Sequence, residues 1–100
     1  MEKVLDRRTI SGVLEPVFKV YNVRKAVLFG SYAKGIADEK SDVDIFVDSR
    51  LRGLKFVGLV ENIKQALGGK DVDVIDETHV EGGSNILSEI EKTGVLIYER

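Results

Sequence analysis

Asp42 and Asp44 stand one residue apart in the stretch DVDIFVD, and this spacing bears directly on chemistry. In a β-strand, residues i and i+2 point to the same side, so the two carboxylates would lie close together. At about 4 Å and an effective dielectric constant of about 20, two like charges repel by about 4 kcal/mol. Such a face is therefore either well hydrated or occupied by a cation.

Magnesium is the cation that suits this pair, because Mg²⁺ prefers hard oxygen ligands and is usually held by one or two carboxylates, water and substrate phosphates. A second pair, Asp71 and Asp73, follows in KDVDVID. As a third carboxylate ligand we prefer Asp73 to Asp71, because Asp71 lies at the edge of the strand beside Lys70. With Asp73 as a third carboxylate, two Mg²⁺ ions could contact both the attacking and the leaving oxygen of a displacement.

Gly30 and Ser31 end the apolar run VRKAVLF and offer a place for phosphate. Glycine allows close backbone approach, and a helix that begins at Ser31 would direct free N–H groups at an anion. The spacing from Gly30 to Gly35 resembles a P-loop, but Ile36 stands where the lysine is required. A calcium loop is also excluded, since neither Asp-x-Asp run has glycine at its sixth position.

The elements that position these residues follow from the spacing of apolar residues, and they predict an α/β (α+β) fold. Glycines at 68, 69 and 94 and a serine at 84 supply helix ends and a cap. The predicted helices cover residues 10–21, 54–67 and 85–93, and the predicted strands cover residues 23–29, 42–48, 70–76 and 95–99.

Three polar positions carry further expectations. Pro16 should kink or restart the first helix, which Asp6 or Thr9 could cap, because proline lacks an N–H. Asp48 is expected to be a solvated turn residue at the end of its strand, and His79 a solvated loop residue. For Tyr32, stacking on a base and covering the sheet edge both stay open.

The composition describes a single domain over residues 1–100, with 17 acidic and 15 basic residues and a formal net charge of −2. This balance provides no long-range attraction to nucleic acid, and no apolar run approaches the length of a membrane span. The chain has no cysteine, which excludes disulfides and thiolate metal sites. We therefore expect a cytoplasmic protein without membrane or nucleic acid as partner.

The stretch GSYAKGIADEKSDVD resembles the motif of minimal nucleotidyltransferases of the DNA polymerase β superfamily, in which Gly-Ser is followed by ten residues and Asp-x-Asp. The resemblance extends to the leading helix, the helix that ends in Gly-Gly, the VDVI strand and the terminal GVLIYE. It implies the nucleotidyltransferase fold, with a mixed sheet of about four strands and helices packed on it.

The resemblance also implies roles for individual residues. Gly30 and Ser31 match the residues that hold the nucleotide phosphates, and the Asp-x-Asp pair that ends in Asp44 matches the metal ligands. Asp73 matches a third carboxylate, which binds metal and can assist deprotonation of the acceptor hydroxyl. Lys34 occupies a position where the family often has arginine, and it offers a phosphate charge without a bidentate fork.

The implied activity is Mg²⁺-dependent transfer of a nucleoside monophosphate, AMP from ATP, to a hydroxyl group. Relatives of this short form are often paired with a helical HEPN-domain protein in toxin–antitoxin systems, which implies a protein acceptor. Two alternatives stay open: a non-catalytic nucleotide-binding or antitoxin module that acts by contact, and a transferase for small molecules. The base preference, the oligomeric state and activity without the partner are also open.

Overall fold

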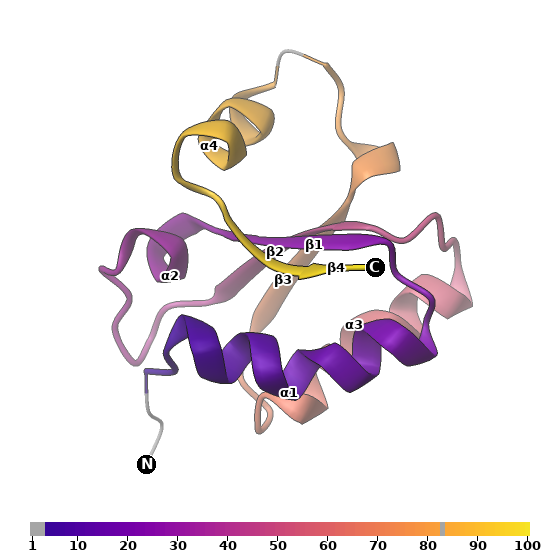
Figure 1. Cartoon of the computed structure of the whole chain (residues 1–100), viewed down its shortest axis with the longest axis horizontal. Coiled ribbons are helices and arrows are strands. Elements are labelled where there is room, and N and C mark those ends of the chain that lie inside the picture. Colours follow the sequence, from indigo (N-terminus) through magenta and orange to yellow (C-terminus); the bar gives the residue numbers. More distant parts are fainter. Residues whose placement is uncertain (1–3, 83) are drawn as a thin grey trace.

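The computed structural model describes residues 4–82 and 84–100, in which four strands form one sheet flanked by helices (Figure 1). This confirms the predicted fold class. The elements follow the order α1 (Arg7–Val20), β1 (Lys25–Phe29), α2 (Gly30–Lys34), β2 (Val43–Asp48), α3 (Leu54–Ala66), β3 (Val72–Asp76), the short 3-10 helix η1 (Glu77–His79), α4 (Asn85–Thr93) and β4 (Val95–Glu99). No helix of the described residues is long and apolar enough to cross a membrane.

The sheet is mixed, with the strand order β3-β2-β1-β4. The inner strand β1 is antiparallel to both of its neighbours, β2 and β4. The pair formed by β2 and β3 is parallel, and α3 provides the long connection that a parallel pair requires. The two strands that carry the Asp-x-Asp pairs are therefore adjacent and run in the same direction.

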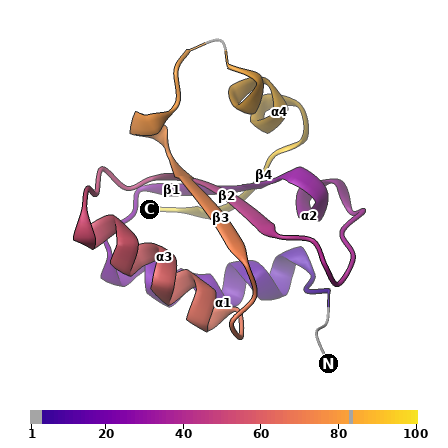
Figure 2. The same cartoon turned by 180° about the vertical axis from the view of Figure 1, so that it is seen from behind.

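One face of the sheet is covered by α1 and α3, which lie side by side in both views (Figures 1 and 2). Alternate residues of each strand meet the apolar sides of these two helices and form the core. The fully buried members of this core include Ile10, Leu14, Phe18, Ala26, Leu28, Val43, Ile45, Val47, Leu59 and Ile63. The acidic side of β2 consequently faces away from α1 and α3.

Helix α1 runs without interruption through Pro16, so the helix does not restart there, whereas the alternative, a kink at Pro16, stays a prediction. Proline removes one N–H that would bond to the carbonyl of Gly12, four residues earlier. Both Pro16 and Gly12 are exposed, so water can satisfy the freed carbonyl. Of the two predicted caps, Asp6 is the one used, because its Oδ1 accepts a hydrogen bond from Thr9 N at 2.7 Å.

The opposite face of the sheet carries α4, which lies across the sheet from α1 and contacts β1 and α2 (Figures 1 and 2). Ser84 caps α4 by accepting a hydrogen bond from Leu87 N, and Gly94 follows its last turn, as the sequence predicted. None of the residues of α4 is fully buried. Helix α4 therefore covers part of the sheet face that carries Asp44 and leaves the rest of that face open.

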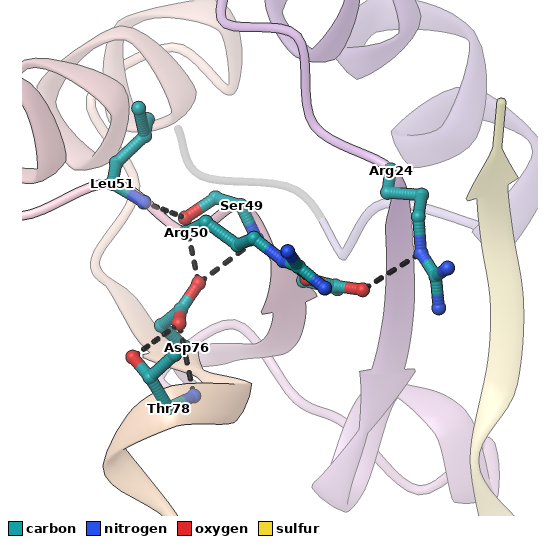
Figure 3. A network of polar contacts seen from close by, with 7 residues as sticks. Arg24, Ser49, Arg50, Leu51, Asp76 and Thr78 are labelled. Carbon is teal, nitrogen blue, oxygen red and sulfur yellow. Dashed lines mark hydrogen bonds and ion pairs between the residues drawn. The ribbon is translucent and has the colours of Figure 1, made fainter.

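Asp48 is only 7% exposed, so the expectation of a solvated turn residue is wrong. Its Oδ2 lies 2.8 Å from Arg24 Nε, and its Oδ1 lies 3.9 Å from Arg50 Nε. The aspartate stays buried because Arg24, which enters β1, compensates its charge. In Figure 3 a dashed line marks the ion pair that Arg24 forms, and Arg50 lies beside it.

Asp76 forms the second buried contact in Figure 3 and joins the ends of β2 and β3. Its Oδ1 accepts hydrogen bonds from Ser49 N and Oγ at 2.9 and 2.6 Å, and its Oδ2 accepts from Thr78 N and Oγ1 at 2.9 and 2.6 Å. Burial alone would raise the pKa of Asp76, but these hydrogen bonds outweigh it and lower the pKa to about 2. The carboxylate thus stays ionised at neutral pH and fixes the loop after β2 to η1.

Candidate active site

The strand register brings two of the predicted aspartates to the same height in the sheet. Asp44 of β2 is the direct partner of Asp73 of β3, and Phe29, the last residue of β1, is the partner of Asp44 on the other side. Val43 points into the core, so Asp42 and Asp44 flank it on the outer side. Asp44 is half-buried, whereas Asp42 and Asp73 are exposed. Asp71 precedes β3, and its Oδ1 lies 3.6 Å from Lys64 Nζ.

Gly30 brings the predicted phosphate turn into direct contact with the carboxylates. Its φ of 72° is in the left-handed region, and a Cβ at this position would collide with Oδ2 of Asp44. Both facts require glycine. Ser31 follows in the first turn of α2, whose N-terminus has no side-chain cap. The backbone of the turn and the carboxylate of Asp44 therefore form one continuous surface.

Asp44 is the residue of this surface whose pKa is raised. Burial raises its pKa, and the charges of Asp73, Asp42 and Glu89 raise it further, to about 6. Burial is the largest cause of this shift, and repulsion by the neighbouring carboxylates adds to it. A cation, or a ligand that brings one, would relieve this repulsion.

Glu89 is the site residue that the sequence analysis missed. It projects from α4, raises the pKa of Asp44, and places Oε1 3.3 Å from Nζ of Lys34 in α2. Glu89 follows Ile86 by three residues, which puts both on the side of α4 that faces the sheet. That spacing was the available signal, but only the position of α4 above β1 connects it with Asp44.

Two other residues with sequence-based expectations, Tyr32 and His79, are not part of the candidate site. Tyr32, only 4% exposed, belongs to the core, with Lys70 Nζ 5.7 Å from the centre of its ring, so it does not offer a stacking surface. His79 is exposed, as predicted, and its ring meets that of Phe56 edge to face. Neither residue contributes to the acidic surface.

The donor chemistry of the acidic surface fits Mg²⁺. Its candidate ligands are the carboxylate oxygens of Asp42, Asp44 and Asp73, which are the hard donors that Mg²⁺ prefers. Within residues 4–82 and 84–100, no three acidic, histidine or cysteine side chains are already gathered around one metal position. The fit therefore rests on the type of donor, the shared register and the raised pKa of Asp44.

Comparison with known proteins places this arrangement in a class. Residues 13–100 match the family described as Polymerase beta, Nucleotidyltransferase, and the chain belongs to this family. A protein adenylyltransferase, MntA, from Thermococcus cleftensis is 42% identical over 65 residues, which cover 63% of this chain and 65% of that protein. The chain thus spans slightly less than two thirds of the length of this relative.

Solved structures share the fold. A toxin–antitoxin structure with AMP-PNP matches with a TM-score of 0.72 and 23% identity, covering 90% of this chain and 73% of the other. The structure of tri-AMPylated Shewanella oneidensis HEPN toxin in complex with MNT antitoxin matches with a TM-score of 0.66 and 20% identity, covering 94% and 73%. At these identities the likeness establishes the architecture.

Proposed function

We propose that the chain is a metal-dependent nucleotidyltransferase that moves AMP from ATP to a hydroxyl group of a HEPN-type protein partner. The observation that carries this proposal is the contact between the Gly30 turn and Asp44, whose register partner is Asp73. A phosphate chain held at the turn would have its α-phosphate beside the carboxylates. Family membership and the relative that is a protein adenylyltransferase support the same reaction.

The residues of the site have separate tasks. Ser31 and the first N–H groups of α2 would hold the phosphates, and Lys34 would add a positive charge beside them. Asp42, Asp44 and Asp73 would hold two Mg²⁺ ions. When bound, these ions neutralise phosphate charge and polarise the phosphoryl oxygens.

Asp73 would take the proton of the acceptor hydroxyl. It lies on the edge strand β3 and is exposed, so an incoming hydroxyl group can reach it. Asp73 would accept the hydroxyl proton while the hydroxyl oxygen forms a bond to the α-phosphorus. The bond from the α-phosphorus to the bridging oxygen breaks, and pyrophosphate leaves with that electron pair.

The protein acceptor is proposed from the relatives. The structural neighbours include an AMPylated HEPN toxin with its MNT antitoxin. We extend this pairing to the present chain as its partner and acceptor, and ATP as the donor fits a cytoplasmic setting. The acceptor would approach from the β3 side, because α4 stands over β1 on the other side of Asp44.

Intact mass spectrometry tests the proposal. The chain is mixed with the protein encoded by the neighbouring gene, ATP and Mg²⁺, and the partner should gain the mass of one or more AMP groups. Asp42→Asn and Asp44→Asn should abolish the gain, because each removes a metal-binding charge at nearly constant volume. Asp71→Asn is the matched control and should retain transfer, since Asp71 pairs with Lys64 outside the site.

The same experiment separates the contact-only antitoxin. If no adduct forms, and wild type and Asp44→Asn inhibit the partner equally, the chain acts by binding alone and the transferase proposal is wrong. Melting curves of all variants show whether a loss of transfer reflects a loss of folding.

A further inference from the structure

A second hollow lies on the same face of the sheet, beyond the carboxylates. It is a cavity of about 220 Å³ between β1, β2, η1 and α4. Val27 and Phe46 line it from the sheet, and Leu87 and Ile90 line it from α4. Ligand sites for whole small molecules usually measure about 300–1,000 Å³, so this cavity suits one group of a larger ligand.

The strand register puts this cavity next to the site. Phe46 follows Asp44 by two residues on β2, so both side chains point to the same face, about 6.6 Å apart along the strand. Across the ladder, Val27 is the partner of Phe46, as Phe29 is the partner of Asp44. The cavity therefore begins one side-chain step from the carboxylate that touches the Gly30 turn.

The lining of the cavity combines apolar and charged residues. Phe46 is half-buried and supplies the aromatic ring of the lining. The charged residues of the lining are Arg24, Lys25, Asp48, Glu77 and Glu91, of which Arg24 and Asp48 pair with each other. A flat ring system with hydrogen-bonding groups on its edge would suit both the apolar and the charged residues of the lining.

We propose that this cavity binds the nucleobase of the nucleoside triphosphate whose phosphates lie at Gly30 and Ser31. The inference rests on the proposed function, because it assumes that nucleotide. The ribose then spans the step from Asp44 to Phe46. Because the cavity lies over β1 and under α4, the β3 side of Asp44 stays open for the acceptor.

Two ligands that differ only in the nucleoside test this assignment. Calorimetry measures the affinities of ATP and of inorganic tripolyphosphate, each with Mg²⁺, for wild type and for Leu87→Trp. The larger side chain fills the cavity from α4, so ATP should bind at least about tenfold more weakly while tripolyphosphate binds equally well. Phe46→Leu removes the aromatic ring and keeps an apolar side chain. This variant should bind ATP severalfold more weakly and should bind tripolyphosphate as well as wild type does.

Val57→Trp is the matched control. Val57 is 56% exposed on α3, which covers the other face of the sheet, so an added tryptophan there should leave both affinities unchanged. Unchanged tripolyphosphate binding shows at the same time that Leu87→Trp is folded. If Leu87→Trp is unfolded, Phe46→Leu alone decides the assignment.

The possible results distinguish the two proposals. If wild type binds ATP and neither cavity variant weakens it, or if tripolyphosphate binds as tightly as ATP, the nucleobase assignment is wrong while the transferase proposal stands. If wild type binds neither ligand, the proposed function fails and the assignment fails with it. If Leu87→Trp keeps its ATP affinity but loses AMP transfer, the cavity receives a group of the acceptor, which also overturns the assignment.

Discussion

At the scale of single residues, Asp44 links the site to stability. Its pKa in the folded chain is about 6, above its usual value of 3.8, because it is buried among other carboxylates. The folded chain therefore retains the proton where the unfolded chain has lost it, and stability falls as pH rises from about 4 to about 6. Above that range, ionised Asp44 opposes folding in the absence of metal.

Asp44→Asn should consequently stabilise the metal-free chain at pH 8 and have little effect at pH 4. We expect a gain of about 1 kcal/mol at pH 8, because partial exposure to solvent weakens the repulsion, and this corresponds to a rise in Tm of about 4–8 °C. Thermal unfolding in EDTA at both pH values measures it. A gain for Asp44→Asn that does not depend on pH would show that ionised Asp44 does not oppose folding.

Single residues also show which features of the structure the sequence does not predict. The aspartates of the acidic surface were predictable, because strand alternation fixes the side to which each one points. The burial of Asp48 and Asp76 was not, because a charged residue is exposed unless a partner compensates it. One partner of Asp76 is Ser49, 27 residues away, and no local pattern indicates that contact.

At the scale of elements, the spacing of apolar residues predicted every strand and every long helix. Most boundaries agree within two residues, but the first helix begins at Arg7 rather than at residue 10. Strand β1 begins at Lys25 rather than at residue 23, after a turn at Asn22, which has a φ of 56°. Periodicity identifies the face that an element buries, but it does not say which elements meet on the opposite face. The placement of α4 beside α2, and with it the role of Glu89, needed the tertiary structure.

Two glycines at the ends of α2 allow the turn itself to be tested. Gly30 and Gly35 have nearly the same φ, 72° and 75°, but only at Gly30 would a Cβ meet another group, the carboxylate of Asp44. Gly35→Ala should cost about 1–2 kcal/mol of unfolding free energy from backbone strain alone. Gly30→Ala should cost more and should displace Asp44.

Urea unfolding and titration with Mg²⁺ and ATP measure the two effects. Gly30→Ala should lose at least about tenfold in nucleotide affinity, whereas Gly35→Ala should retain it, because its site geometry is intact. Equal losses of affinity in the two variants would show that the contact between Gly30 and Asp44 has no special role.

At the scale of the whole molecule, nucleotide should stabilise the chain only when metal is present. ATP brings several negative charges to a surface that already carries several carboxylates, so metal must neutralise them. At a ligand concentration 100 times its Kd, binding adds about 2.7 kcal/mol to the free energy of unfolding, which raises Tm by about 10 °C or more. Melting curves with ATP and Mg²⁺, ATP and EDTA, and Mg²⁺ alone test this, and an equal rise with EDTA would remove metal from the mechanism.

The position of β4 governs the order in which the molecule can fold. Lys25 pairs with Asp48 on one side and with Glu99 on the other, so β1 gains its second neighbour only when residues 95–99 have been made and have docked. Pairing between such distant segments is slow, because the entropy cost of closing a long loop comes before any stabilising contact forms. Until then, β1 presents an open edge that can pair with another chain. A nascent chain on the ribosome would therefore contain the Gly30 turn and the aspartates of the site before β4 can cover the free edge of β1.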